Sequence, residues 1–335
     1  MTHVLPRTSA PTASVVVPAF NAAATLEHTL TSLRLQTYQD LEIIVVDDGS
    51  TDDTPQIAQA IARQDPRLRV VRQANRGLAG ARNSGIAAAR AGYIGFCDAD
   101  DQWAPGKLAA HIAHLDANPL VGLSFSGSQL MDENGALMRR AQKPRLTGIG
   151  AAHIFKRNPV GNGSVPVLRR AALESIAWRP SCERERDWVF DETFRQSEDI
   201  ECWLRLALST DWEIEGIRGL LTRYRITSGG LSAATDRQFA AWERMVEKLT
   251  PLDPQFFDRY APTARAYQLR YLARRAVSDG RGVEARRLLR RAFASSPWPL
   301  IEEPIRSGVT LAAATLVDRP LGRALHRVAT RPASA

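Results

Sequence analysis

The chain has 335 residues, of which 44% are hydrophobic and 24% charged, and this composition is typical of a soluble globular protein. The length allows one large α/β domain with an appendage. The net charge of +8 is concentrated near one end, because residues 261–335 hold 14 arginines, no lysine and five acids. Residues 1–260 therefore carry a net charge of −1, and we expect no nucleic-acid partner.

The cysteines and the start of the chain favour a cytoplasmic protein. Cys97, Cys182 and Cys202 form no CxxC pair, so reduced thiols are the simplest interpretation. The first ten residues lack the basic and apolar segments of a signal peptide. The longest late apolar run, residues 309–317, is too short to span a bilayer, so we expect membrane contact to be peripheral, at the inner face.

Apolar runs and helical patterns alternate over the first hundred residues. Residues 14–20 are a β-branched run that predicts a buried strand, and the segment 41–50 gives a second buried strand that runs into acids and glycine; a helical pattern follows each of them. Two more strands are predicted at 68–72 and 93–97, with an alanine-rich helix over 78–91 between them. This alternation predicts an α/β fold with a mainly parallel central sheet flanked by helices.

Polar residues follow these predicted strands at the points where they end. The segments 18–21, 47–50 and 98–101 are placed in this way. The carboxyl ends of parallel strands share one edge of the sheet, where ligands bind. Acids gathered there repel one another unless a positive group lies between them. A hard divalent cation that bridges to phosphate meets that need.

The segments VVVPAFN, IIVVDDGSTDDT, NRGLAGARNSGIAAARAGYIGFCDADD and SEDIECWLRLAL follow one another along the chain. In order and spacing they resemble the family-2 glycosyltransferases with the GT-A fold. The resemblance implies a glycosyltransferase domain over residues 13–235. A flexible N-terminus is expected over 1–12, and an α-helical, arginine-rich extension over 236–335.

The resemblance also implies an activity. A sugar would pass from a nucleotide-diphosphate sugar to an acceptor hydroxyl on a glycan, a polysaccharide or a lipid-linked saccharide, with Mn²⁺ or Mg²⁺ as cofactor. With one base-like carboxylate and no second acid placed to form a covalent intermediate, a single inverting displacement is favoured.

Five candidate donor-binding residues follow the first two predicted strands. Pro18, Ala19 and Asn21 would line the nucleotide pocket in a protein of this family. Asp48 would accept hydrogen bonds from the base. Asp47 is assigned to the same pocket, and a role in the turn is an equally good alternative for it.

The segments ARNSG and DADD supply the next candidates. The resemblance places Arg82 and Asn83 near the base and the diphosphate, since an arginine fork suits a phosphate. An exposed helix residue is the alternative for Arg82. Asp98 would face the ribose and Asp100 would ligate the metal, both within the DxD motif. Asp101 is expected to begin the next helix.

Asp199, with Glu198 beside it, occupies the place of the family's catalytic base. Such a carboxylate takes the proton from the acceptor hydroxyl. The alternative is a pair of acids at a helix N-terminus. Thr227 stands where many relatives carry a histidine, so the diphosphate clamp departs from the family pattern, and Arg225 is a candidate contributor.

The segment after the DxD motif contains three further residues of interest. Asn162 and Ser164 are candidates for the border between donor and acceptor, with a hairpin turn as the alternative. Trp103 is interpreted as a packing residue rather than a platform for sugar stacking.

The arginine-rich extension contains two predicted amphipathic helices over residues 266–297, joined at SDGRG. Three interpretations of its arginines remain open. They form a solvated face, a platform for anionic phospholipid in peripheral membrane contact, or a docking site for an acidic partner.

Three other classes of protein were compared with the pattern. A nucleotidyltransferase should carry a glycine-rich, basic phosphate loop after the first strand, and a dinucleotide-dependent dehydrogenase should carry GxGxxG there. The segment PAFNAAATLE matches neither. A catalytically weak nucleotide-sugar-binding protein should lack an aspartate at position 48, 100 or 199, and all three are present.

Overall fold

The computed structural model describes residues 10–226 and 235–318, which form two compact units. The first, here called the sheet unit, comprises residues up to Ala151 together with Pro159–Thr227. The second, the helical unit, comprises Ala152–Asn158 and the chain from Ser228 onward. A short helix from the middle of the sequence therefore groups with the C-terminal helices.

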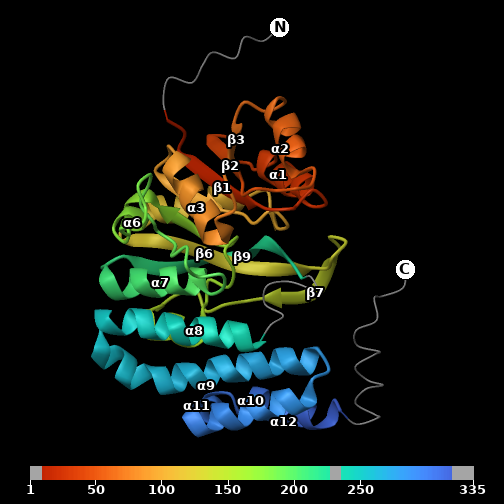
Figure 1. Cartoon of the computed structure of the whole chain (residues 1–335), viewed down its shortest axis with the longest axis vertical. Coiled ribbons are helices and arrows are strands. Elements are labelled where there is room, and N and C mark those ends of the chain that lie inside the picture. Colours follow the sequence, from red (N-terminus) through yellow and green to blue (C-terminus); the bar gives the residue numbers. More distant parts are fainter. Residues whose placement is uncertain (1–9, 227–234, 319–335) are drawn as a thin grey trace. The chain divides into compact units, whose positions relative to one another are not determined.

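One sheet organises the sheet unit, with the strand order β3-β2-β1-β4-β8-β6-β9-β5 and β7 paired to β6 (Figure 1). The strands are β1 (Ala13–Ala19), β2 (Leu41–Asp47), β3 (Leu68–Arg72), β4 (Tyr93–Phe96), β5 (Gln102–Trp103), β6 (Val121–Met131), β7 (Leu137–Gln142), β8 (Val167–Arg169) and β9 (Glu213–Arg225). The four predicted strands are present and mutually parallel, which confirms the α/β fold class.

The rest of the sheet is mixed. Strand β8 runs antiparallel to both β4 and β6, whereas β6 and β9 are parallel. The residues of β6 are nearly all buried, as they are in β1 and β2, so this strand is also covered on both faces. A short apolar run does not indicate which strand it pairs with. For this reason the sequence predicted the first four strands better than the later strands of the sheet.

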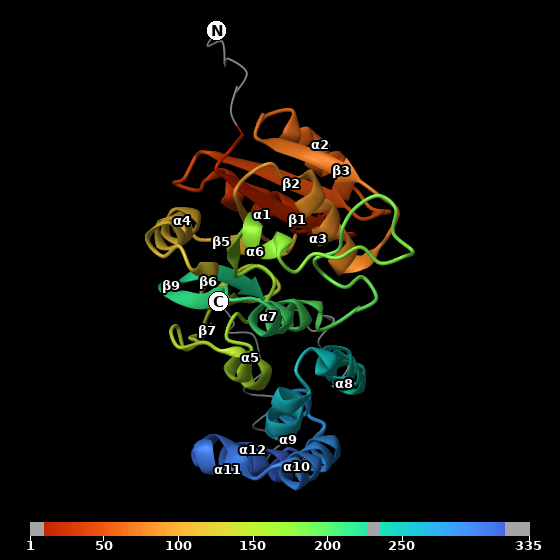
Figure 2. The ribbon, with the colours of Figure 1, turned by 90° about the vertical axis from the view of Figure 1, so that its left-hand side faces the viewer.

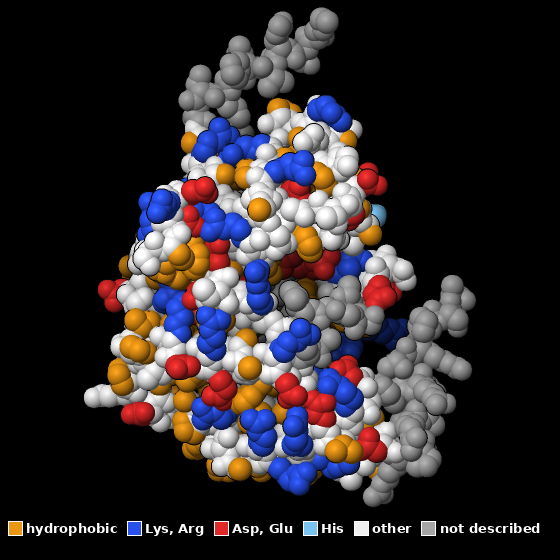
Figure 3. Space-filling view, in the orientation of Figure 1, with side chains coloured by type: hydrophobic (Ala, Val, Ile, Leu, Met, Phe, Trp, Pro, Cys, Tyr) orange, Lys and Arg blue, Asp and Glu red, His pale blue; other side chains and the backbone are white. Residues whose placement is uncertain are grey.

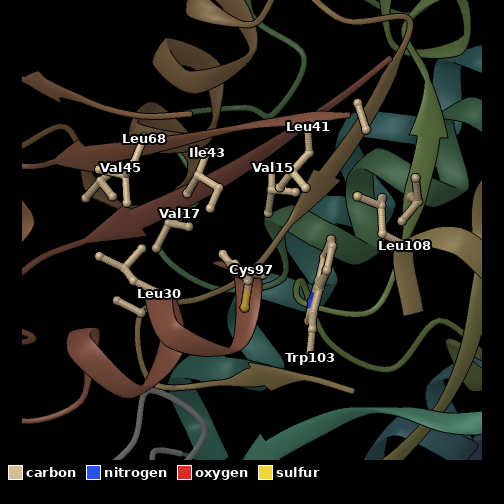
Figure 4. Packing of buried hydrophobic residues seen from close by; sticks show 14 of the residues in the cluster. Val15, Val17, Leu30, Leu41, Ile43, Val45, Leu68, Cys97, Trp103 and Leu108 are labelled. Atoms are coloured by element: carbon tan, nitrogen blue, oxygen red, sulfur yellow. The ribbon is translucent and has the colours of Figure 1, made fainter. Parts of the chain in front are cut away.

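Helices cover both faces of the parallel strands. They are α1 (Leu26–Arg34), α2 (Thr54–Ala62), α3 (Gly77–Ala88), α4 (Lys107–Ala117), α6 (Arg170–Glu174) and α7 (Glu198–Ser209). Alternate residues of β1, Val15 and Val17, pack with Leu30 of α1 and Leu108 of α4 in one core cluster (Figure 4). Val16 points the other way and meets α3 at Gly85.

The helical unit is built from α5 (Ala151–Arg157) and the C-terminal helices (Figure 2). These are α8 (Thr235–Leu249), α9 (Pro254–Ser278), α10 (Gly282–Ser295), α11 (Trp298–Glu302) and α12 (Pro304–Leu316), with a 3₁₀ turn at Thr250–Leu252. The end of α9 at Ser278 and the start of α10 at Gly282 confirm the predicted break at SDGRG. Leu272, Leu288 and Ala314 bring α9, α10 and α12 into one apolar core.

More than half of the described arginines from residue 261 onward are paired with acids of the same unit. Six of the ten arginines between residues 261 and 318 make ion pairs there: Arg265 with Glu243, Arg270 with Glu303, Arg281 with Glu284, Arg286 with Asp318, Arg287 with Asp236 and Arg306 with Glu303. The basic composition therefore does not produce a continuous unpaired basic face in the described chain. Within 10–226 and 235–318, no helix is both long enough and apolar enough to cross a membrane.

We predict that Gly85→Ala destabilises the sheet unit. A Cβ at position 85 would lie 2.1 Å from Cγ1 of Val16, a side chain held in the interior of β1. Overpacking of this kind costs about 1–3 kcal/mol, which exceeds the helix propensity gained from alanine. The measurement is the free energy of unfolding in urea. Gly92→Ala, where nothing lies within 4 Å of the new Cβ, is the control. Equal stability of the two variants would contradict this packing.

Candidate active site

The residues predicted to bind the donor lie at one edge of the sheet. Ala19 at the end of β1 is paired in register with Asp47 at the end of β2, and the Asp48 amide donates to the Ala19 carbonyl at 2.8 Å. Val16 is paired with Phe96 of β4, so Asp98 emerges at the same edge. Pro18 and Ala19 are both buried.

The loops after β1 and β2 are joined through Asn21. Its backbone amide donates to the Ser50 hydroxyl at 3.0 Å, and its side-chain oxygen accepts from the Thr51 amide at 2.9 Å. Asn21 has φ = 49°, a left-handed conformation that asparagine tolerates better than most residues. Its exposed side chain therefore lies at the rim of this edge, held against the second loop.

Asp47 and Asp48 are both buried and both already bonded within the protein. The Asp47 carboxylate accepts from the Ser50 amide at 3.0 Å and from Arg72 Nε at 2.9 Å, as a turn residue does. Asp48 accepts from the side-chain amide of Gln73 at 2.6 Å and from the backbone amides of residues 76 and 77 at 2.8 Å each. Asp48 thus compensates the free amides at the start of α3.

Arg82 is almost completely enclosed, with 1% of its surface exposed. One guanidinium nitrogen donates to Glu198 Oε1 at 2.8 Å and the other donates to Asp98 Oδ1 at 2.9 Å. Its pKa is raised above the ordinary value because the attraction of Asp98 and Glu198 exceeds the opposing effect of burial. The alternative of an exposed helix residue is wrong for Arg82.

Both the oxygen and the nitrogen of the Asn83 side-chain amide are hydrogen-bonded to protein groups. Its oxygen accepts from the backbone amides of Val189 and Phe190, and its nitrogen donates to the Phe190 carbonyl and to Glu192. An asparagine amide has two donors and one oxygen that accepts two bonds, so this inventory is complete. Asn83 fixes the segment before α7 onto α3.

The three aspartates after β4 have different surroundings. Asp98 is partly exposed and paired with Arg82, and its backbone amide donates to Ser164 Oγ at 2.9 Å. Burial raises the pKa of Asp100 to about 6, and the charge of Asp98 adds to the increase. Asp101 is fully buried, and burial raises its pKa well above the ordinary range.

The structure decides the roles of Asp101 and Trp103. The prediction that Asp101 begins a helix is wrong. It precedes β5, and its carboxylate accepts from the Arg225 amide of β9 at 2.9 Å, while α4 begins at Lys107. Trp103 is a packing residue, as predicted, since it is 1% exposed and its indole donates to the Ser164 carbonyl at 2.9 Å.

The chemistry of Asp100 fits a divalent cation. No salt bridge between described residues reaches its carboxylate, and the repulsion of Asp98 is relieved only partly by Arg225. The same part of the chain contains no group of three or more His, Cys, Asp or Glu arranged to hold a metal ion. Such a site suits Mg²⁺ or Mn²⁺ that keeps waters and takes phosphate oxygens as further ligands.

Glu198 and Asp199 begin α7, directly after Ser197, whose φ of 66° is left-handed. Strained conformations of this kind are often found at functional sites. Glu198 is bound to Arg82, whereas the Asp199 carboxylate accepts from the backbone amide of the next residue at 2.7 Å. Burial raises the pKa of Asp199 to about 7, the Glu198 charge adds to this, and Arg82 opposes it.

Arg225 and the 162–164 segment brace the aspartates from two sides. Arg225 Nε donates to the Asp100 carbonyl at 2.8 Å, and its Nη1 donates to the carbonyls of residues 132 and 133. Asn162 Oδ1 accepts from the Ser164 amide at 2.9 Å, which is a turn-type bond. Thr227 lies outside the described residues.

Sequence reasoning missed a charged network that packs the segment before α7 against α3. Arg76 pairs with Glu183 and with Glu192, and Arg186 pairs with Glu192 at 2.5 Å. Gln73 was also missed as the partner of Asp48. No local pattern marks these residues, since their partners lie about 110 positions away for Arg76 and 25 positions away for Gln73.

Residues 14–177 match the family model described as Glycosyl transferase family 2. The succinoglycan biosynthesis protein ExoO of Rhizobium meliloti is 28% identical over 333 residues, covering 96% of this chain and 88% of that protein. The glycosyltransferase EpsJ of Bacillus subtilis, described as uncharacterized, is 50% identical over 117 residues, 34% of each chain. The chain spans about a third of the length of EpsJ and of a Rickettsia felis relative in these matches.

Two solved structures resemble this chain in fold. The mannosyltransferase PcManGT from Pyrobaculum calidifontis, in complex with GDP-Man and Mn²⁺, has a TM-score of 0.60 at 20% identity, covering 96% of this chain and 84% of that one. S. aureus TarS 1–349 has a TM-score of 0.54 at 18% identity, covering 88% and 91%. At these identities the similarity shows the fold alone, which is the GT-A type expected above.

We predict opposite stability effects for the two neighbouring acids of α7. Folded Asp199 keeps its proton up to about pH 7, whereas the ordinary pKa is 3.8. The folded state therefore binds more protons in this window, and the contribution of Asp199 to stability falls as the pH rises from about 4 to about 7. Asp199→Asn should raise the free energy of unfolding at pH 8, and the gain should vanish near pH 4.

Glu198→Gln is the matched variant. It removes an ion pair with the buried Arg82, so it should lower the free energy of unfolding at pH 8 by about 1.5–3 kcal/mol. Urea unfolding at several pH values measures both effects. The interpretation of the two environments fails if Asp199→Asn is less stable than the unchanged protein at pH 8.

Proposed function

We propose that this protein, whose residues 14–177 match the model of glycosyl transferase family 2, transfers a sugar from a nucleotide-diphosphate sugar to an acceptor hydroxyl. One observation carries the proposal. The Arg82 fork joins Asp98, at the end of β4, to Glu198, beside the base candidate Asp199. The donor-binding candidate and the residue directly before the base candidate are therefore held by the same side chain.

The donor edge runs from Pro18, Ala19 and Asn21 to Asp48 in this proposal. The nearby Asp47 maintains the turn after β2, and Asn83 positions the segment before α7. Asp98 lies toward the ribose, and Asp100 is the protein ligand of Mn²⁺ or Mg²⁺. Bound there, the cation would neutralise the diphosphate as a leaving group. GDP-Man with Mn²⁺ in PcManGT, and UDP-GlcNAc in a TarS complex, support a nucleotide-diphosphate sugar as the donor class.

Asp199 is the proposed general base, with Glu198 as a positioning residue. Glu198 is engaged with Arg82, so its lone pairs are less available for proton transfer. Asp199 takes the proton of the acceptor hydroxyl as the oxygen bonds to the anomeric carbon. The bond from that carbon to the diphosphate oxygen breaks, and its electron pair leaves with the diphosphate. Attack opposite the leaving group inverts the anomeric centre.

The acceptor class follows from the relatives. ExoO and ExoU, both described as succinoglycan biosynthesis proteins, are 28% and 34% identical to this chain over the matched regions. We therefore infer a saccharide acceptor, free or lipid-linked, of the kind extended in polysaccharide assembly.

We expect donor binding to need a divalent cation. Without it the negative charges of Asp98 and Asp100 face the negative diphosphate. By calorimetry, UDP and GDP should bind at least roughly tenfold more weakly in chelator than in Mn²⁺. This factor corresponds to a loss of about 1.4 kcal/mol or more in binding free energy. Asp100→Asn should lose the Mn²⁺ dependence, whereas the exposed Asp211→Asn should keep it. Equal affinity of the unchanged protein with and without chelator would reject the metal site.

We expect Asp199→Asn to lower transfer by roughly 10²–10⁴-fold with donor affinity nearly unchanged. Because the pKa of Asp199 is about 7, the rate of the unchanged protein should rise as the pH passes through 7 and the base loses its proton. Glu198→Gln should keep more activity than Asp199→Asn. The assay is nucleotide release over a panel of nucleotide sugars.

The stereochemistry of the product tests the displacement itself. An α-linked donor should yield a β-linked product, as read by NMR of the anomeric proton. Retention of the donor configuration would refute the single displacement. Full activity of Asp199→Asn would instead move the base to Glu198.

A further inference from the structure

The N-terminal half of helix α12 is inverted with respect to an ordinary surface helix, whereas Ala314 in its second half joins the apolar core. Its packed face carries the polar residues Ser307 and Thr310, which are 0% and 5% exposed. Ser307 is held there by Arg270, at 2.7 Å, and by the Pro299 carbonyl. The opposite face carries Ile305, which is 80% exposed, and Val309, which is 63% exposed. A helix that packs with its polar side and exposes its aliphatic side leaves a surface in need of a partner.

Exposed apolar residues are concentrated on α11 and α12. Ile305, Val309 and Leu316 recur at helical spacing on the outer face of α12, and Trp298 and Ile301 of α11 are also exposed. We call these five residues the apolar stripe. Most large exposed hydrophobic residues elsewhere in the described chain are isolated, so their concentration within residues 298–316 is not explained by ordinary surface composition.

Charge indicates what covers the apolar stripe. Residues 235–318 carry a net charge of +4, and residues 319–335, which follow α12 directly, add four arginines and no acid. Figure 3 shows lysine and arginine side chains interleaved with acidic and hydrophobic ones over the helical unit. Arg306, 69% exposed, lies next to Ile305 in the sequence. A second copy of this chain would bring an equally basic segment to the stripe, whereas an anionic lipid surface would attract it.

We propose that the apolar stripe of α11 and α12 docks on an anionic phospholipid surface. The aliphatic side chains and the Trp298 ring enter the boundary between headgroups and acyl chains, where amphipathic surfaces of this type bind. Arginines of the helical unit contact the lipid phosphates. This differs from a purely basic platform, because six of the ten arginines of residues 261–318 are already paired with acids.

The test is vesicle flotation of the full chain at low salt, with phosphatidylcholine vesicles that contain or lack phosphatidylglycerol. The variant Ile305→Ser/Val309→Ser removes the centre of the stripe. Val283→Ser is the matched control, since Val283 is 69% exposed in the same unit but lies at the start of α10, outside the stripe. Circular dichroism and light scattering of every sample record folding and oligomeric state.

We expect binding to vesicles with phosphatidylglycerol and much weaker binding to those without it. The double variant should reduce partitioning roughly tenfold or more, and Val283→Ser should leave it unchanged. Three results would overturn the proposal. They are no binding at low salt, equal binding by the folded double variant, and a dimer of the unchanged protein that the double variant dissociates. Donor-dependent nucleotide release is a separate readout, so failure here leaves the proposed sugar transfer unaffected.

Discussion

The site depends on the enclosure of one positive charge. Arg82 lies almost without solvent between Asp98 and Glu198, and these acids reach it from segments far apart in the sequence. A guanidinium at this depth is tolerated only where acceptors match its fork, because an unpaired buried charge is strongly destabilising. The two bonds therefore fix the end of β4 and the start of α7 with respect to α3. Gly163 approaches the same guanidinium too closely for a side chain, since a Cβ there would lie 1.9 Å from Arg82 Nη2.

This arrangement separates two neighbouring carboxylates by environment. Glu198 is paired with Arg82. Asp199 is buried next to the like charge of Glu198, and for these two reasons its pKa rises to about 7. Pairs of acids whose surroundings push their pKa values apart are a common basis for acid–base chemistry near neutral pH. The DxD segment follows the same logic. Asp98 is neutralised by Arg82 and Asp100 is left with incomplete compensation, which is the state that a cation would relieve.

The helical unit shows that composition and surface are different properties. Fourteen arginines near one end of the sequence suggest a basic face, yet acids of the same unit pair with six of the ten described ones. The distinctive surface is instead aliphatic, on α11 and α12. Local exposed ion pairs contribute little stability individually, so their effect here is mainly on which charges remain available to a partner.

The sequence by itself determined the parallel strands, the helices between them, and the convergence of Pro18, Asp48 and Asp98 on one edge. Short apolar runs ending in polar residues specify such strands locally, and the parallel-sheet rule then brings their ends together. Tertiary structure alone decided what those side chains contact. The Asn83 side chain is hydrogen-bonded to the Phe190 backbone, and the Asp101 carboxylate is hydrogen-bonded to β9. On α12, Ser307 is buried whereas Ile305 is exposed. Each outcome depends on a partner many residues away, and no periodicity within one segment records which partner packs against it.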